Sequence, residues 1–287
     1  MSTSDLVLDR PVAHAPSRMS ARLLRSELRL VFRRRRNIGM LAVLAAAPIL
    51  LGVIIRLSGG GSGGGPPLLA QVTQNGFFLG LASLVFASPL FLPMVIAVVA
   101  GDSVAGEASS GTLRNLLVIP VSRTRVLAVK YAGVIAYALA CLAAVVVSGL
   151  ITGFILFPAG DVVLLSGTAV SMVEAIGRAG LVVLYMTAML ATLGAIGMFF
   201  STLTEVPMGA MAATVTLAVI SQILDAIPQV SAIHEALPTH WWMTFTDLLR
   251  DPMALGNLGT GLLVSAAYVG VFGSLAWARL TTKDITS

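Results

Sequence analysis

The chain has 287 residues, of which 57% are hydrophobic and only 11% charged, with a formal net charge of +5. A soluble domain carries about 25% charged residues, so this chain has too little polar surface to cover its apolar residues in water. The composition therefore excludes an ordinary soluble domain and predicts that the lipid bilayer is the solvent for most of the chain. The single cysteine, Cys141, excludes an internal disulfide and a multi-thiolate metal site.

The excess of positive charge is concentrated at the N-terminus. Half of the 18 Lys and Arg residues lie at or before Arg36, directly ahead of the first long apolar run. That position is typical of a signal for membrane topology. Aromatic residues do not alternate with these arginines, which argues against binding of nucleic acid.

Residues 1–19 contain prolines, serines and acidic residues without periodicity, and they predict a disordered cytoplasmic tail. From Ser20 to Arg33, leucines recur at helical spacing between arginines. This pattern predicts an amphipathic helix on the membrane interface, with Ser20 as its N-cap. Four arginines follow at the expected lipid interface, where they either set orientation alone or form a specific lipid or partner site: Arg33, Arg34, Arg35 and Arg36.

Residues 20–287 are expected to form one all-α transmembrane domain. Six apolar stretches are long enough to cross a hydrocarbon core of about 30 Å at 1.5 Å per residue: residues 38–55, 77–101, 131–157, 180–201, 207–224 and 258–277. Prolines at 48, 89 and 93 predict bends. Gly149 and Gly153 predict a face for close helix packing.

The distribution of positive charge predicts the orientation. All Lys and Arg residues except Arg56, Arg178 and Arg250 fall on segments that six spans place on the same side as the N-terminus. Both termini are therefore expected in the cytoplasm. The longest outer segment runs from Asp225 to Asn257, and its Trp241 and Trp242 are predicted to anchor at the lipid interface.

Residues 102–130 form the largest polar segment between two spans, and this topology places it in the cytoplasm. Leu113, Leu116 and Leu117 recur at i, i+3 and i+4 and predict a short helix that Pro120 ends. Such a helix either lies on the membrane or binds a partner protein, and the spacing alone leaves both possibilities open.

We expect this chain neither to hydrolyse ATP nor to act as an enzyme. Its two lysines, Lys130 and Lys283, do not stand in a GxxxxGK[ST] motif, so any ATP is bound by another polypeptide. The predicted span interiors lack ionisable residues, which argues against a proton relay. No catalytic residues and no metal site are predicted. His234 and His240 are six residues apart, a spacing that does not place them on one helical face.

The residues from Glu107 to Arg123 follow the pattern E-x-x-x-G-T-L-R-x-L-L-x-x-P-V-S-R. This pattern resembles the cytoplasmic signature of ABC-transporter permeases of the type-2 exporter family. The resemblance implies a bacterial cytoplasmic membrane protein whose coupling loop, residues 102–130, contacts the ATPase. The implied docking residues are Glu107, Gly111, Thr112, Leu113, Arg114, Leu116, Leu117, Pro120 and Arg123.

Further roles follow from the same resemblance. Glu107 is expected to hold the loop by a hydrogen bond or an ion pair. Arg114 and Arg123 are expected to pair with partner carboxylates or lipid phosphate. The family pairs two permease copies, as a homodimer or with a homologous permease, with two copies of a separate ATP-binding subunit that carries ATP and Mg.

The cargo is not encoded in any motif. Apolar spans without buried charge favour an amphipathic or hydrophobic substrate such as a drug, lipid or peptide, which would include multidrug efflux. The alternative function is a passive channel or a secondary transporter without an ATPase partner.

Overall fold

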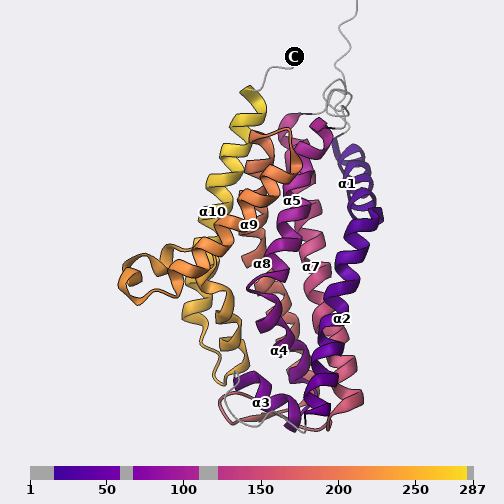
Figure 1. Cartoon of the computed structure of the whole chain (residues 1–287), viewed down its shortest axis with the longest axis vertical. Coiled ribbons are helices and arrows are strands. Elements are labelled where there is room, and N and C mark those ends of the chain that lie inside the picture. Colours follow the sequence, from indigo (N-terminus) through magenta and orange to yellow (C-terminus); the bar gives the residue numbers. More distant parts are fainter. Residues whose placement is uncertain (1–15, 59–66, 110–121, 283–287) are drawn as a thin grey trace, which may run out of the picture.

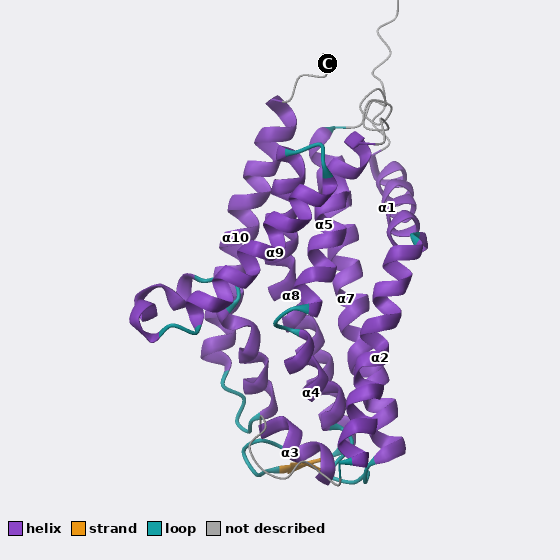
Figure 2. Cartoon of the chain, in the orientation of Figure 1, coloured by secondary structure: helices purple, strands orange, loops and turns teal. Residues whose placement is uncertain are grey.

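The structure is a computed structural model that describes residues 16–58, 67–109 and 122–282. These residues form a long helical bundle with one pair of short strands (Figure 2). Six helices are long and apolar enough to cross a membrane, which confirms the all-α, six-span prediction: α2 (Arg35–Leu57), α5 (Phe91–Ser109), α7 (Arg123–Leu156), α8 (Met172–Leu203), α9 (Pro207–Asp225) and α10 (Leu255–Thr282).

The predicted amphipathic helix is present as α1 (Pro16–Arg33) and begins four residues earlier than the leucine pattern indicated. Ser20 therefore lies inside the helix and is not its N-cap, and the predicted disordered tail is wrong for residues 16–19. Arg34 has an extended backbone, with φ −65° and ψ 123°, and it separates α1 from α2.

The second predicted span, residues 77–101, is broken into two helices. α3 (Pro67–Gln74) leads into α4 (Phe78–Ala87), and α5 starts only at Phe91. The break lies at Pro89, since proline has no N–H for the helical ladder and its ring clashes with the preceding turn.

The described parts of the predicted coupling loop, residues 102–109 and 122–130, are mostly helical. α5 continues past the predicted boundary at Gly101 to Ser109, and α7 begins at Arg123 rather than at residue 131. The polar residues at these positions lower the local hydropathy. A hydropathy pattern therefore ends α5 too early and begins α7 too late. Residues 110–121 lie outside the described residues.

The bundle has two distinct ends (Figure 1). At the arginine-rich end, α1 meets α2, α5 ends, α7 begins and α10 ends. At the hairpin end lie α3 and two antiparallel strands, β1 (Val162–Val163) and β2 (Ala169–Val170), in which Val162 pairs with Val170. Gly167 has a φ of 86° in the intervening turn, a conformation that favours glycine.

The core lies between α4, α5, α7 and α8. α8 is the most enclosed span, with 72% of its most apolar stretch buried, against 17–22% for α2, α9 and α10. The predicted close-packing face is confirmed, because a Cβ atom at Gly149 would overlap Gly80 and one at Gly153 would overlap Gly76. Only glycine lets these two backbones approach so closely.

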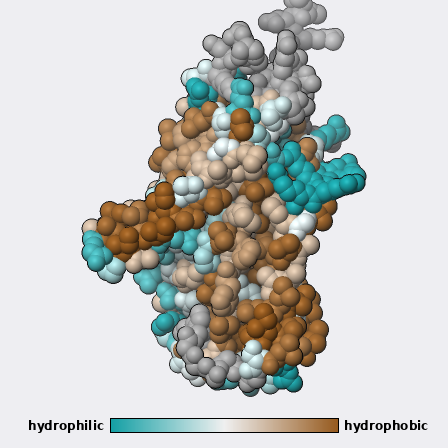
Figure 3. Space-filling model, viewed as in Figure 1, coloured by the Kyte–Doolittle hydropathy of each residue, from teal (hydrophilic) through white to brown (hydrophobic). Residues whose placement is uncertain are grey.

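The segment between α9 and α10 contains two 3₁₀ helices, η1 (Pro228–Ala236) and η2 (His240–Leu249), and it projects sideways from the bundle at mid-height (Figure 1). Its surface is largely hydrophobic (Figure 3). The predicted lipid anchors Trp241 and Trp242 are only 8% and 3% exposed. Their rings pack inside the protein and not at a lipid interface, because η2 lies against α8 and α10.

Candidate functional site

The candidate site lies at the arginine-rich end. Of the predicted docking residues, the structure describes Glu107, in the last turns of α5, and Arg123, the first residue of α7. The other predicted docking residues lie outside the described residues: Gly111, Thr112, Leu113, Arg114, Leu116, Leu117 and Pro120. The site is therefore built from the helices that flank this segment.

Lys130 of α7 is the centre of the site. Its ammonium lies 2.5 Å from Oε1 of Glu107 on α5 and 3.5 Å from Oε1 of Glu27 on α1. The lysine side chain is only 4% exposed, and the two glutamates are about 15% exposed. A buried ammonium is tolerated only where carboxylates compensate its lost hydration. The ion pair expected for Glu107 is thus present, and it joins three helices.

A second ion-pair group surrounds Asp102, one turn before Glu107 on α5. Both Arg34 and Arg36 pair with its carboxylate, with Arg36 Nη2 at 3.0 Å from Oδ2. A Cβ atom at Gly106 would overlap this carboxylate, so glycine makes room for it. Arg34 and Arg36 of the predicted lipid-interface block therefore also pair with the protein itself, through Asp102, and a lipid contact of the block stays a prediction.

The two ion-pair groups form one cluster. Residues from both line a single cavity of about 20 Å³, together with Asn37 and Ser103. Asn37 fixes the kink between α1 and α2, because its Nδ2 donates to the Val31 carbonyl at 2.8 Å and its own carbonyl accepts from Tyr137 Oη at 2.7 Å. The cluster therefore holds α1, α2, α5 and α7 together at this end.

Arg123 joins the start of α7 to the end of α10. Its Nη1 donates to the carbonyls of Leu280 and Thr281 at 2.7 and 2.9 Å. A cation is favourable at a helix C-terminus, where carbonyls lack partners within the helix. Among the described residues Arg123 thus binds main-chain carbonyls, and its expected pairing with a partner carboxylate or lipid phosphate stays a prediction.

α5 is also fastened to α8 just before the cluster. Ser201 Oγ donates to the Gly101 carbonyl at 2.6 Å and accepts from the N–H groups of Val104 and Ala105 at 3.1 and 2.9 Å. A hydroxyl inserted into a helical turn in this way is a recognised cause of local bending. These three hydrogen bonds join the last turns of α5 to α8.

Sequence reasoning missed Glu27 and Asp102. Glu27 is the only acid in α1, where it stands among arginines. Asp102 lies one residue beyond the predicted end of the second span. Glu27 stands among the arginines of α1, but Asp102 has no arginine run near it in the sequence, and no local pattern pairs either acid with its partner.

A different buried cation lies at the hairpin end. Arg178 of α8 has a side chain that is 6% exposed and donates from Nη2 to Glu174 at 2.7 Å. Its Nη1 donates to the carbonyls of Leu248 and Arg250 at 3.2 and 2.7 Å, and Asp251 lies 3.7 Å away. Arg178 therefore fastens the end of η2 to α8.

The histidines considered in the sequence lie around Asp225, at the end of α9. His240 Nδ1 is 2.5 Å and His234 Nδ1 is 3.9 Å from its Oδ1. Among the residues that the structure describes, no group of three or more His, Cys, Asp or Glu residues has the arrangement of a metal site. This group links α9 to η1 and η2.

Comparison with known proteins identifies the family of the chain. The family model described as ABC-2 family transporter protein matches residues 32–227, from the end of α1 to just beyond α9. No curated protein matches the sequence. The matched range contains Asp102, Glu107 and Lys130, and it ends before η1.

Proposed function

Since the chain belongs to the ABC-2 family of transporter proteins and is a permease of that type, we propose that it is the membrane subunit of an ATP-driven exporter. A separate ABC ATP-binding subunit carries ATP and Mg and binds to the segment between α5 and α7. Its conformational cycle moves the helices of the permease and switches the access of the substrate across the membrane.

The observation that supports this proposal most is the position of Lys130. It pairs with Glu107, three residues before the 110–121 segment, and lies nine residues after that segment on α7. Both flanks of the proposed docking segment are thus joined by a buried ion pair. Because breaking such a pair leaves uncompensated charge in a dry environment, a force on the segment moves α5 and α7 together.

Two further contacts extend this movement. Glu27 connects Lys130 to α1, and Ser201 connects α5 to α8. Coupling between distant sites requires packed or hydrogen-bonded elements that move as units. The cluster at the arginine-rich end meets this requirement for α1, α5, α7 and α8.

The proposed assembly has two permease copies and two ATPase copies, with a homodimer as the preferred form and a homologous permease as the other. Exposed apolar side chains of α9, among them Met208, Ile220 and Ile223, are available to lipid or to a second copy. The proposed location is the bacterial cytoplasmic membrane, with the arginine-rich end in the cytoplasm, as the bias in Lys and Arg favours.

The proposed cargo is an amphipathic or hydrophobic molecule such as a drug, a lipid or a peptide. In the six described spans, charged side chains occur only within the first or last few turns of each helix. The middle of the bundle therefore offers apolar surfaces and hydroxyl groups, and this suits an apolar cargo better than an ion.

Co-expression with an ABC ATP-binding subunit tests the proposal. We expect the two chains to co-purify and the permease to change the ATPase rate. Substitution of Leu113 and Leu116 by Asp should abolish co-purification, since both leucines belong to the apolar stripe of the predicted docking helix. The matched control is Leu255→Asp, an exposed leucine at the start of α10. A stable complex of the double variant with full ATPase activity would contradict the docking role.

A further inference from the structure

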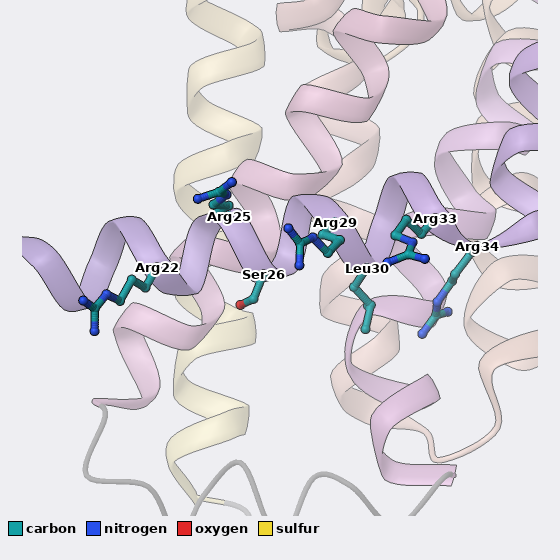
Figure 4. A pocket seen from close by; sticks show the side chains of 7 residues that line it. All are labelled: Arg22, Arg25, Ser26, Arg29, Leu30, Arg33 and Arg34. Atoms are coloured by element: carbon teal, nitrogen blue, oxygen red, sulfur yellow. The ribbon is translucent and has the colours of Figure 1, made fainter.

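The described part of α1 carries an arginine row that the ion-pair cluster does not use. Arg22, Arg25, Arg29 and Arg33 recur at intervals of three and four residues, so they share one face of the helix. Figure 4 shows these side chains along the stretch of α1 that leads to Arg34. In Figure 3 the same region is a strongly hydrophilic patch on a mainly hydrophobic surface.

The charge of this row is not neutralised within the described residues. Glu27 is the only acid in α1, and it pairs with Lys130 on the other side of the helix. No carboxylate among the described residues pairs with Arg22, Arg25, Arg29 or Arg33, whereas Arg34 and Arg36 share Asp102. Several guanidinium groups on one face attract an anion, and phosphate suits them because it accepts two hydrogen bonds from one arginine.

The arginines line an open hollow of about 600 Å³, here called the arginine hollow, together with Ser26 and Leu30. This volume lies within the range of small-molecule sites, roughly 300–1,000 Å³. Ser26 and Leu30 add a hydroxyl and an apolar side chain to the lining. The hollow therefore has room for a phosphate with its attached polar group.

Apolar surface adjoins the arginine hollow. Leu30 and Phe32 on α1 are 44% and 37% exposed, and Ile38 and Val43 on α2 are more than half exposed. Since α2 spans the membrane and begins directly after Arg34, its exposed side chains lie beside lipid tails. A ligand with an anionic head and apolar tails fits this combination better than a soluble anion or an acidic protein.

We infer that the arginine hollow is a binding site for an anionic phospholipid, whose phosphate binds the guanidinium groups and whose acyl chains lie along α2. Arg34 connects this site to the ion-pair cluster, because it lines the hollow and pairs with Asp102. A bound phosphate competes with Asp102 for Arg34 and leaves Arg36 as the remaining partner of Asp102. The lipid thereby loosens the link between α2 and α5.

The test uses the full-length chain in detergent and does not need an ATPase, so it is independent of the proposed function. Short-chain phosphatidylglycerol is titrated and followed by native mass spectrometry. Phosphatidylcholine with the same chains controls for the tails, and glycerol 3-phosphate controls for the free anion. We expect saturable binding of phosphatidylglycerol alone.

The double variant Arg25→Gln/Arg29→Gln should weaken this binding on the order of fivefold per arginine, the size of one cation's attraction to anionic lipid. Arg279→Gln removes one exposed arginine from the last turn of α10, at the same end of the bundle, and should leave the affinity within about twofold. Equal binding of phosphatidylcholine, or unchanged affinity in the double variant, would overturn the site. Equally tight binding of glycerol 3-phosphate would show a free-anion site instead of a lipid site.

The link to the cluster has its own test. Asp102→Asn removes the charge that competes for Arg34, so phosphatidylglycerol should bind this variant several-fold more tightly. Unchanged or weaker binding of phosphatidylglycerol by this variant would overturn the proposed competition between phosphate and Asp102 for Arg34. If the arginine substitutions instead weaken only the capture of a co-expressed ATPase, the surface binds protein and the lipid inference is wrong.

Discussion

Among the described residues, each end of the bundle buries one cation, and the two cations have different partners. Lys130, at the arginine-rich end, pairs with carboxylates on two other helices. Arg178, at the hairpin end, pairs with Glu174 one turn earlier on its own helix, and it binds main-chain carbonyls at the end of η2, with Asp251 3.7 Å away. The first arrangement joins rigid helices to one another, while the second fastens an irregular segment to one helix.

This difference assigns different roles to the two ends. A helix that is fixed to other helices by buried charge transmits displacement along its length. A short irregular segment absorbs displacement, so its fastening stabilises the fold without connecting moving parts. We therefore expect the Lys130 cluster to affect both stability and coupling, and Arg178 to affect stability alone.

The largest effect is expected for Lys130→Met. This change leaves Glu107 and Glu27 in a mostly buried site without their cation, which costs about 3–5 kcal/mol for a fully buried pair and about half of that for these slightly exposed carboxylates. A clear fall in the detergent melting temperature is expected, together with loss of substrate-stimulated ATPase activity in the complex. Lys130→Arg, which keeps the charge, is the control.

A second variant sharpens this prediction. Glu107→Gln together with Lys130→Met removes one of the stranded charges and should regain part of the lost stability, but not the coupling. If the Lys130→Met protein melts like the parent chain and keeps its substrate-stimulated ATPase activity, the Lys130 cluster has no special role in coupling, and the proposed difference between the two ends is wrong.

The next effect is expected for Arg178→Met. The variant loses charged hydrogen bonds to the carbonyls of Leu248 and Arg250, each worth about 1.5–3 kcal/mol when the donor is charged. We expect a lower melting temperature and faster proteolysis near η2, measured by limited digestion. ATPase capture and stimulation should stay normal in the molecules that remain folded. If Arg178→Met instead loses ATPase stimulation while its melting temperature stays normal, the hairpin end also transmits motion.

The smallest effect is expected for Asp102→Asn. Arg34 and Arg36 are 36% and 45% exposed, so water screens both pairs and each contributes about 1 kcal/mol or less. A shift of only a few degrees in melting temperature is expected. Gly106→Ala is a useful companion, because its added methyl group displaces the Asp102 carboxylate without removing charge. The two variants should weaken the α2–α5 link alike, as measured by cross-linking of cysteine pairs introduced on these helices.

Local pattern predicted much of the fold but misplaced the helix ends. Hydropathy predicts the right number of spans because each contains a long apolar run, although the second run is divided between α4 and α5, and Gly149 and Gly153 form the predicted packing face. The ends of α5 and α7 were missed because Asp102, Glu107 and Lys130 look like loop residues when they are read alone. Trp241 and Trp242 were placed at the lipid interface from their residue type, although η2 folds back and buries them.

The sequence by itself determined the membrane class, the number of spans and the position of the proposed docking segment in the chain. Apolarity and helical period are properties of neighbouring residues, and no distant partner is needed to detect them. Only the tertiary structure decided which charges meet. Glu27 and Lys130 are far apart in the chain, as are Arg34 and Asp102, and each pair forms because an isolated charge in a dry bundle is costly. Packing of α1, α5 and α7 selects these partners, and it leaves the remaining arginines of α1 for an anion outside the described chain.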